Sequence, residues 1–179
     1  MTTTDKLSRA VIIALTTPLG FAAQEHRSAA PLSPNEWNTV RDWLDAGSMA
    51  SADLIEENGG PVSLTGIDYS LSYRMSCLLE RLDDVRRAEH ELAERGIWML
   101  TSCDGSYPRR WAARLGRSAP PVLYGEGSTE NLTRPALGIV GSRDISESLA
   151  EIANVLGAAS VLGDYAVVSG ACAGLIESA

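Results

Sequence analysis

The sequence predicts an α/β protein with a helical N-terminal half, and two observations carry that prediction. First, two short apolar runs, residues 136–140 and 165–169, flank a stretch of helical periodicity that begins near Ser146. Unbroken apolar runs are typical of strands buried on both faces of a parallel sheet, so this order indicates a βαβ unit. Second, the part of the chain up to residue 95 shows helical patterns alone.

The N-terminal part begins with two predicted helices. Residues 5–15 carry apolar positions at helical spacing. Ser33, Pro34 and Glu36 form a strong helix start. Ser33 can cap the helix, Pro34 suits the first helical position, and Glu36 completes a capping box. That helix is expected to end by Gly47.

Two further helical patterns precede the α/β part. Residues 51–57 suit a short helix. Residues 70–95 repeat apolar positions in steps of three and four, which predicts one long amphipathic helix or two helices joined near Asp83. The sequence thus predicts a helical N-terminal domain, residues 1–95, followed by an α/β domain, residues 96–179.

The α/β part opens with a short apolar strand, residues 97–101, and a second strand is expected at residues 122–124. Between them lies a segment with four arginines and no acidic residue: Arg109, Arg110, Arg114 and Arg117. The last three would share one face of a helix. We interpret this face as solvent-exposed, with a phosphate-contacting patch as the alternative.

The composition bounds the class of protein. The chain has 179 residues, of which 45% are hydrophobic, and a net charge of −8. Strong non-specific binding to nucleic acid rests on Lys and Arg, so in this acidic chain any site for a polyanion must be local. No apolar run reaches the ~18 residues of a membrane span and no secretory signal opens the chain, so a cytoplasmic protein without a membrane partner is expected.

The sequence offers little for catalysis or metal binding. Cys77, Cys103 and Cys172 are widely spaced and lack histidines at ligand spacing, so neither a disulfide framework nor a metal site is expected. His26 and His90 lie far from the predicted strand ends, and no nucleophile elbow or flanking carboxylate pair is present. We therefore predict no catalytic residue, no cofactor and no enzymatic activity.

Each strand of the predicted βαβ unit ends on glycine. The residues predicted to bind phosphate are Gly141, Ser142 and Arg143 after the first strand, and Ser169, Gly170 and Gly174 after the second. Because the crossover is right-handed, the two strand ends should lie side by side, where α/β proteins bind ligands. Backbone N–H groups and the helix dipole attract anions there, and Arg143 adds a fork suited to phosphate oxygens. The sequence therefore predicts a pocket for a nucleotide or a nucleic-acid backbone.

Short motifs follow one another in a fixed order through the second half of the chain. They are Gly-Ile-Trp-Met-Leu-Thr at 96–101, Tyr-Pro at 107–108, Pro-Pro-Val-Leu-Tyr at 120–124, Gly127, Ile-Val-Gly-Ser-Arg at 139–143 and Val-Val-Ser-Gly at 167–170. Their succession resembles the DNA-processing protein A family (DprA, also called Smf). Residues 32–38 and the long helical pattern after them resemble the N-terminal region of its long-form branch.

The resemblance implies a Rossmann-like core, doubly wound and mainly parallel, behind a helical N-terminal domain. It also implies single-stranded DNA binding, homodimerisation and the loading of a RecA-type recombinase onto incoming DNA during natural transformation. In that family the Gly-Ser-Arg turn contributes to the pocket that holds the DNA backbone, which carries over to residues 141–143. The Ser-Gly turn carries over to Ser169, Gly170 and Gly174.

The chain departs from the family pattern at the second turn. Family members commonly read Ser-Gly-Gly-Ala-Arg-Gly-Ile/Val-Asp there, whereas this chain has Ala173 at the Arg position and Ile176 at the Asp position. Loss of a charged contact of this kind costs about 1.5–3 kcal/mol, so weaker DNA binding is expected. Family members also continue past the position of Ala179, so the Rossmann-like domain is expected to be incomplete.

Two other functions stay open at this point. One is a nucleotide-ligand sensor or hydrolase on the related Rossmann-like scaffold of cytokinin-activating phosphoribohydrolases, although their Pro-Gly-Gly-x-Gly-Thr-x-x-Glu motif is absent from this sequence. The other is a remnant whose helical domain folds while the βαβ unit binds nothing. The substitution Arg143→Ala separates the DNA binder from the nucleotide binder, because it should weaken DNA binding in the first and mononucleotide binding in the second.

Overall fold

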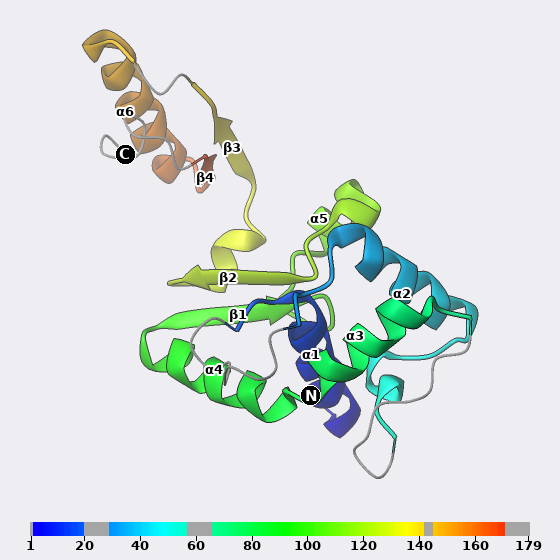
Figure 1. Ribbon diagram of the computed structural model, residues 1–179. Coiled ribbons are helices and arrows are strands. Elements are labelled where there is room, and N and C mark those ends of the chain that lie inside the picture. Colours follow the sequence, from blue (N-terminus) through cyan, green and yellow to red (C-terminus); the bar gives the residue numbers. More distant parts are fainter. Residues whose placement is uncertain (1, 20–28, 57–65, 142–144, 171–179) are drawn as a thin grey trace. The chain divides into compact units, whose positions relative to one another are not determined.

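A computed structural model of the chain describes residues 2–19, 29–56, 66–141 and 145–170. These residues form a mixed α/β structure with six α-helices and four strands (Figure 1). The chain divides into two compact units, Met1–Gly127 and Ser128–Ala179, and each is described by itself. Within the described ranges no helix has the length and apolar character needed to cross a membrane.

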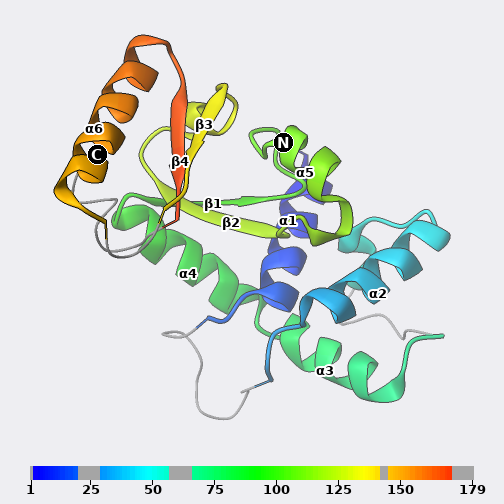
Figure 2. The same cartoon turned by 90° about the horizontal axis from the view of Figure 1, so that it is seen from above.

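The first unit is built around helix α1 (Thr3–Thr16), the helix predicted at residues 5–15. Thr2 exchanges hydrogen bonds with Asp5 in a capping box, which fixes where the helix begins. Residues 11–15 are at most 1% exposed. Figure 2 shows α1 between α4 (Leu82–Glu94) and α2 (Pro34–Ala46). The core of this unit therefore surrounds α1.

Helix α2 begins as the sequence predicts. The Ser33 hydroxyl accepts a hydrogen bond from the Glu36 amide at 3.3 Å, and the Glu36 carboxylate accepts one from the Ser33 amide at 2.8 Å. The predicted capping box is therefore complete. The short helix expected at residues 51–57 is a 3₁₀ turn, η1 (Ser51–Leu54), which packs against α1.

The long amphipathic pattern is divided into two helices, α3 (Tyr69–Leu79) and α4, joined at Arg81. Arg81 is 8% exposed. Its Nε donates to the Ala14 carbonyl at 3.1 Å and its Nη2 donates to the Thr17 carbonyl at 2.9 Å. Burial lowers the pKa of Arg81 from its ordinary value. The carbonyl end of α1 carries the negative end of a helix dipole and stabilises this buried cation.

Strands β1 (Ile97–Thr101) and β2 (Val122–Glu126) pair antiparallel in a sheet of their own. Trp98 lies opposite Gly125, and its indole Nε1 donates to the Gly127 carbonyl at 2.9 Å. The ring occupies the space over Gly125, where a Cβ atom would lie 2.1 Å from it. The aromatic ring thus covers a glycine on the neighbouring strand and requires glycine there.

Helix α5 (Arg109–Leu115) is shorter than the sequence predicts. Gly116 has a φ of 53°, in the region that favours glycine, and a 3₁₀ turn, η2 (Gly116–Ser118), follows. Arg117 therefore lies outside the helix, and the prediction that it shares a helical face with the other arginines is wrong. Its guanidinium instead pairs with Asp42 of α2 through both terminal nitrogens.

The second unit contains the predicted βαβ unit. A 3₁₀ turn, η3 (Thr129–Leu132), leads into β3 (Ala136–Ile139), α6 (Glu147–Leu162) and β4 (Ala166–Ser169). Strands β3 and β4 pair in parallel over their full length. The predicted fold class, with a helical N-terminal region followed by part of a parallel α/β domain, is confirmed.

The expectation that β3 and β4 are buried on both faces is wrong for the described residues. Leu137 and Val167 are each 37% exposed and Val168 is 53% exposed. The reason is the number of layers, because α6 is the one α-helix in the described part of this unit. A two-stranded sheet with a single helix has at most one covered face. Strands β1 and β2 do not supply further strands to this sheet.

The compact units and the predicted domains divide the chain at different places. Strand β1 packs against α1 and α4, so β1, α5 and β2 belong to the unit that ends at Gly127. The prediction places a boundary between domains after residue 95, and the division into compact units does not test it. It stays a prediction.

Candidate nucleic-acid interface

The parallel pairing of β3 and β4 places their carboxyl ends side by side. Ile139 lies opposite Ser169 in the register. Gly141 comes two residues after β3 and Gly170 directly follows β4. The described half of the predicted site is therefore brought together at one edge.

The rest of the predicted phosphate site cannot be placed. Ser142, Arg143 and Gly174 lie outside the described residues, as do Ala173 and Ile176, which depart from the family pattern. The roles predicted for these side chains stay predictions.

The turn after β4 leaves space beside its backbone. Ser169 is exposed, and its hydroxyl donates to the Gly170 carbonyl at 3.3 Å. A Cβ atom added to Gly170 would meet no described atom within 4 Å, and the φ of Gly170 lies outside the region that favours glycine. Neither packing nor backbone strain therefore demands glycine at this position. The small residue leaves the backbone open to close approach from outside.

Helix α6 begins without a capping hydrogen bond from the side chain of its N-cap residue. Ser146 takes the N-cap position in an extended conformation, yet its hydroxyl makes no capping hydrogen bond. The hydroxyl lies 3.4 Å from the Ser148 hydroxyl instead. Uncapped N–H groups at the positive end of a helix dipole attract anions. Glu147 in the first turn of the helix competes for the same positive potential.

Charged side chains in the described part of the second unit are mostly acidic. Arg134 is the one cation there, and its Nη1 lies 3.3 Å from the Asp164 carboxylate. Glu130, Glu147 and Glu151 add negative charge. Among the described residues, attraction for a polyanion at the strand ends therefore rests on backbone amides.

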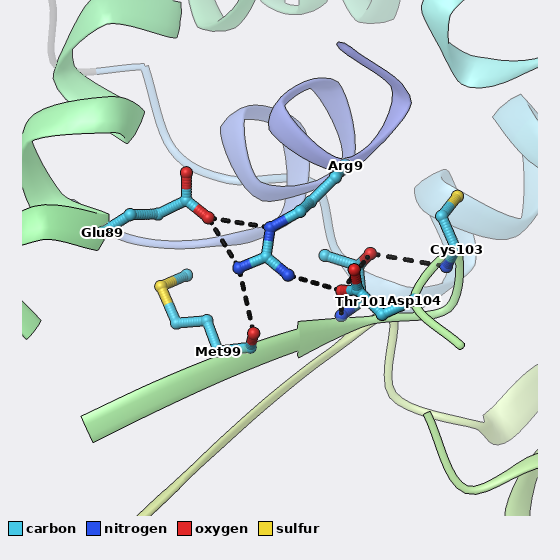
Figure 3. A network of polar contacts seen from close by, with 6 residues as sticks. All are labelled: Arg9, Glu89, Met99, Thr101, Cys103 and Asp104. Atoms are coloured by element: carbon cyan, nitrogen blue, oxygen red, sulfur yellow. Dashed lines mark hydrogen bonds and ion pairs between the residues drawn. The ribbon is translucent and has the colours of Figure 1, made fainter. Parts of the chain in front are cut away.

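Sequence analysis missed a polar network at the turn that leads into α5 (Figure 3). Arg9 of α1 donates to Glu89 at 2.9 Å through Nε and to Asp104 at 2.5 Å through Nη1. Its Nη2 donates to the Met99 carbonyl at 2.9 Å. The Asp104 carboxylate also accepts the amide and the hydroxyl of Thr101, at 2.7 and 3.0 Å. The network fixes α1, α4 and β1 to this turn.

Further contacts hold α5 at both ends. Tyr107, 4% exposed, precedes the helix, and its hydroxyl donates to the Pro120 carbonyl at 2.6 Å. Burial raises the pKa of Tyr107, which keeps the hydroxyl protonated as a donor. Beyond the other end of the helix, Arg117 pairs with Asp42. Because of these contacts α5 is a fixed platform on the first unit.

Cysteine and metal chemistry find no support in the described ranges. Cys77 and Cys103 are free thiols, and burial raises the pKa of the Cys103 thiol, which makes it a poor nucleophile. Cys172 lies outside the described residues. Among the residues the structure describes, no three acidic, histidine or cysteine side chains gather as a metal site would require.

The geometry defines an α/β unit in which the ends of two parallel strands lie side by side. Residues 98–179 match the family model described as DNA recombination-mediator protein A. This match agrees with the family that the motif order predicts. It supports a general role in DNA processing as a recombination mediator. No curated protein matches the chain.

Proposed function

We propose that the chain binds the backbone of single-stranded DNA at the strand-end edge of its βαβ unit. The observation that carries this proposal is the parallel register of β3 and β4, which sets Gly141 and Gly170 at adjacent strand ends. The uncapped first turn of α6 adds N–H donors at the same edge. Ser142, Arg143, Ser169 and Gly174 complete the proposed contacts.

A salt-dependent binding titration tests this site. Fluorescence anisotropy of a labelled poly-dT oligonucleotide is measured with the 179-residue chain at low and moderate salt. We expect binding that weakens as salt rises, because bound Arg and Lys release counterions from the phosphates. Arg143→Ala should weaken binding about tenfold or more, since it removes a charged contact.

Arg134→Ala provides a matched control within the same unit. It also removes one arginine, but Arg134 already pairs with Asp164 and precedes β3 rather than following it. Its affinity for DNA should stay within about threefold of the unmodified chain. If the folded chain binds no DNA at low salt, or if both substitutions weaken binding equally, the strand-end site is wrong. Competition by a mononucleotide at micromolar concentration would favour the nucleotide-ligand alternative.

We propose further that DNA binding serves a non-enzymatic, cytoplasmic role in which the chain passes single strands to a RecA-type recombinase. The match of residues 98–179 to the family model of DNA recombination-mediator protein A supports this role. The test is the rate at which RecA filaments form on poly-dT with and without the chain. Sedimentation of the chain alone tests the homodimer that the resemblance implies. An unchanged filament rate in the presence of bound chain would contradict the mediator role.

A further inference from the structure

Eight of the twelve arginines that the structure describes have a partner. The described arginines paired with carboxylates are Arg9, Arg74, Arg86, Arg87, Arg117 and Arg134. Arg81 binds backbone carbonyls, and Arg95 also has a partner. Five described cations have neither an ion pair nor a side-chain hydrogen bond: Lys6, Arg41, Arg109, Arg110 and Arg114.

Four of these five cations lie on two helices that are joined to each other. Arg109, Arg110 and Arg114 belong to α5, and all three are exposed. Arg41 belongs to α2, and its charge acts on Tyr107, the residue two positions before α5, where it opposes the rise in pKa that burial causes. The ion pair between Arg117 and Asp42 joins the 3₁₀ turn that follows α5 to α2.

We propose that this arginine surface, formed by Arg41, Arg109, Arg110 and Arg114, is a second contact for the backbone of single-stranded nucleic acid. Several cations without an ion pair on one surface repel one another, whereas a polyanion would remove the repulsion. The guanidinium fork suits phosphate oxygens. Arg110 and Arg114 are four residues apart on α5, so they lie on the same face of the helix.

An aromatic side chain on the same helix favours a single strand over a duplex. Trp111 lies between the arginines in sequence and is partly exposed, and Leu115 is 48% exposed. Single-stranded nucleic acids bind where cations follow the backbone and aromatic rings stack with unpaired bases. A duplex offers no unpaired base to stack.

The platform beneath the arginine surface is already rigid. Tyr107 and the Asp104 network hold the start of α5, and Arg117 holds the segment after it. A preorganised surface loses little conformational freedom when a ligand binds.

The inference rests on the proposed DNA-binding function, and its test separates the two sites. The triple variant Arg109→Gln, Arg110→Gln, Arg114→Gln is compared with the triple control Arg86→Gln, Arg87→Gln, Arg134→Gln. Both sets remove three positive charges from exposed or half-exposed positions, but the control arginines are paired with acids. Far-UV circular dichroism and tryptophan fluorescence establish that both variants are folded.

The readout is the dependence of poly-dT affinity on salt. Each phosphate contact on a single strand contributes about 0.7 to the slope of log K against log salt, so loss of three contacts should reduce the slope by about 2. Affinity at low salt should fall more than tenfold, against less than threefold for the control. Arg41→Gln alone should reduce the slope by about 0.7. We expect the tryptophan fluorescence of the unmodified chain to be quenched when DNA binds. Trp111→Phe should remove this quenching.

Each combination of outcomes decides between the two sites. If the triple variant matches its control while Arg143→Ala loses binding, the arginine surface is wrong and the strand-end site stands. If the triple variant loses binding while Arg143→Ala retains it, the strand-end site is wrong. If the unmodified folded chain binds no DNA, both are wrong. Equal affinity for a duplex of the same length would contradict the choice of a single strand.

Discussion

Helices α1 and α6 are both rich in apolar residues, but they lie in very different surroundings. Residues 11–15 of α1 are at most 1% exposed, in a core formed with α3, α4 and η1. Six large apolar side chains of α6 are at least 44% exposed: Leu149, Ile152, Val155, Leu156, Val161 and Leu162. Apolar composition therefore does not determine burial by itself. An apolar helix is buried only where enough elements of its own unit surround it.

The tryptophans make this difference measurable. Trp37, Trp43, Trp98 and Trp111 all belong to the first unit, whereas the second unit has none. Tryptophan fluorescence therefore reports unfolding of the first unit, and far-UV circular dichroism reports both. Coincident transitions by the two probes would indicate that the units unfold together.

The largest expected effect sharpens the contrast between the two helices. Leu15→Ala removes a side chain that is fully buried in the core around α1, so it should destabilise the first unit by about 3–4 kcal/mol. The urea midpoint followed by tryptophan fluorescence measures this. Leu162→Ala is the control, and it is followed by far-UV circular dichroism because the second unit has no tryptophan. Its 90% exposed side chain should change the free energy of unfolding by no more than about 0.5 kcal/mol. Similar losses at both positions would contradict the contrast.

A smaller effect concerns the polar network of the first unit. Arg9→Met should cost about 2–3 kcal/mol, because it leaves the largely buried carboxylates of Glu89 and Asp104 without their partner. The control is Arg86→Met, whose ion pair with Asp83 is exposed and contributes less than about 0.5 kcal/mol. Urea unfolding compares them. An Arg9→Met midpoint within error of the control would show that the network is not a structural tie.

The smallest expected effect is a loss of folding stability at acidic pH. Hydrogen bonds from Arg74 and from Ser33 lower the pKa of Glu36 to about 2, below its value of 4.5 in an unfolded chain. A depressed pKa contributes stability above pH 4.5 that is lost as the pH falls towards 2. Because the pair is about one-third exposed, we expect a loss of about 1 kcal/mol.

Urea midpoints at pH 7 and pH 3 measure the acid effect. Glu36→Gln should be less stable than the unmodified chain at pH 7, and the difference should shrink at pH 3. A difference that is constant over this range would show that the Glu36 carboxylate is not preferentially stabilised in the folded state.

Patterns within a few residues of the sequence predicted the helices and strands better than they predicted the contacts that these elements make. The capping box of Ser33 and Glu36 spans three residues, and the βαβ unit follows from two apolar runs and the helical pattern between them, so the sequence reveals both. The partners of Arg9 are 80 to 95 positions away, and those of Arg81 are 64 and 67 positions away. No periodicity can identify contacts at such separations.

The site was predicted in part for the same reason. Right-handed crossover places consecutive parallel strand ends together whatever their side chains, so the proximity of Gly141 and Gly170 followed from topology. The burial of β3 and β4 could not be predicted in the same way. An apolar run shows that a strand can pack against other elements, but it does not show which elements are present to cover it. The sequence offered a phosphate-contacting patch in this segment only as an alternative. Which arginines lack an acidic partner depends on contacts between residues far apart in the sequence, such as the pair of Arg117 and Asp42.

Arg81 constrains the length of the chain where α3 meets α4. Successive residues of an α-helix are rotated by about 100°, so one residue inserted between Leu79 and Leu82 would turn α4 by that angle about its axis. The buried positions Val85 and Ala88 would leave the core, and the guanidinium would leave the α1 carbonyls. The joint therefore fixes the helical phase of α4 relative to α1, and a change of chain length there would disturb both helices at once.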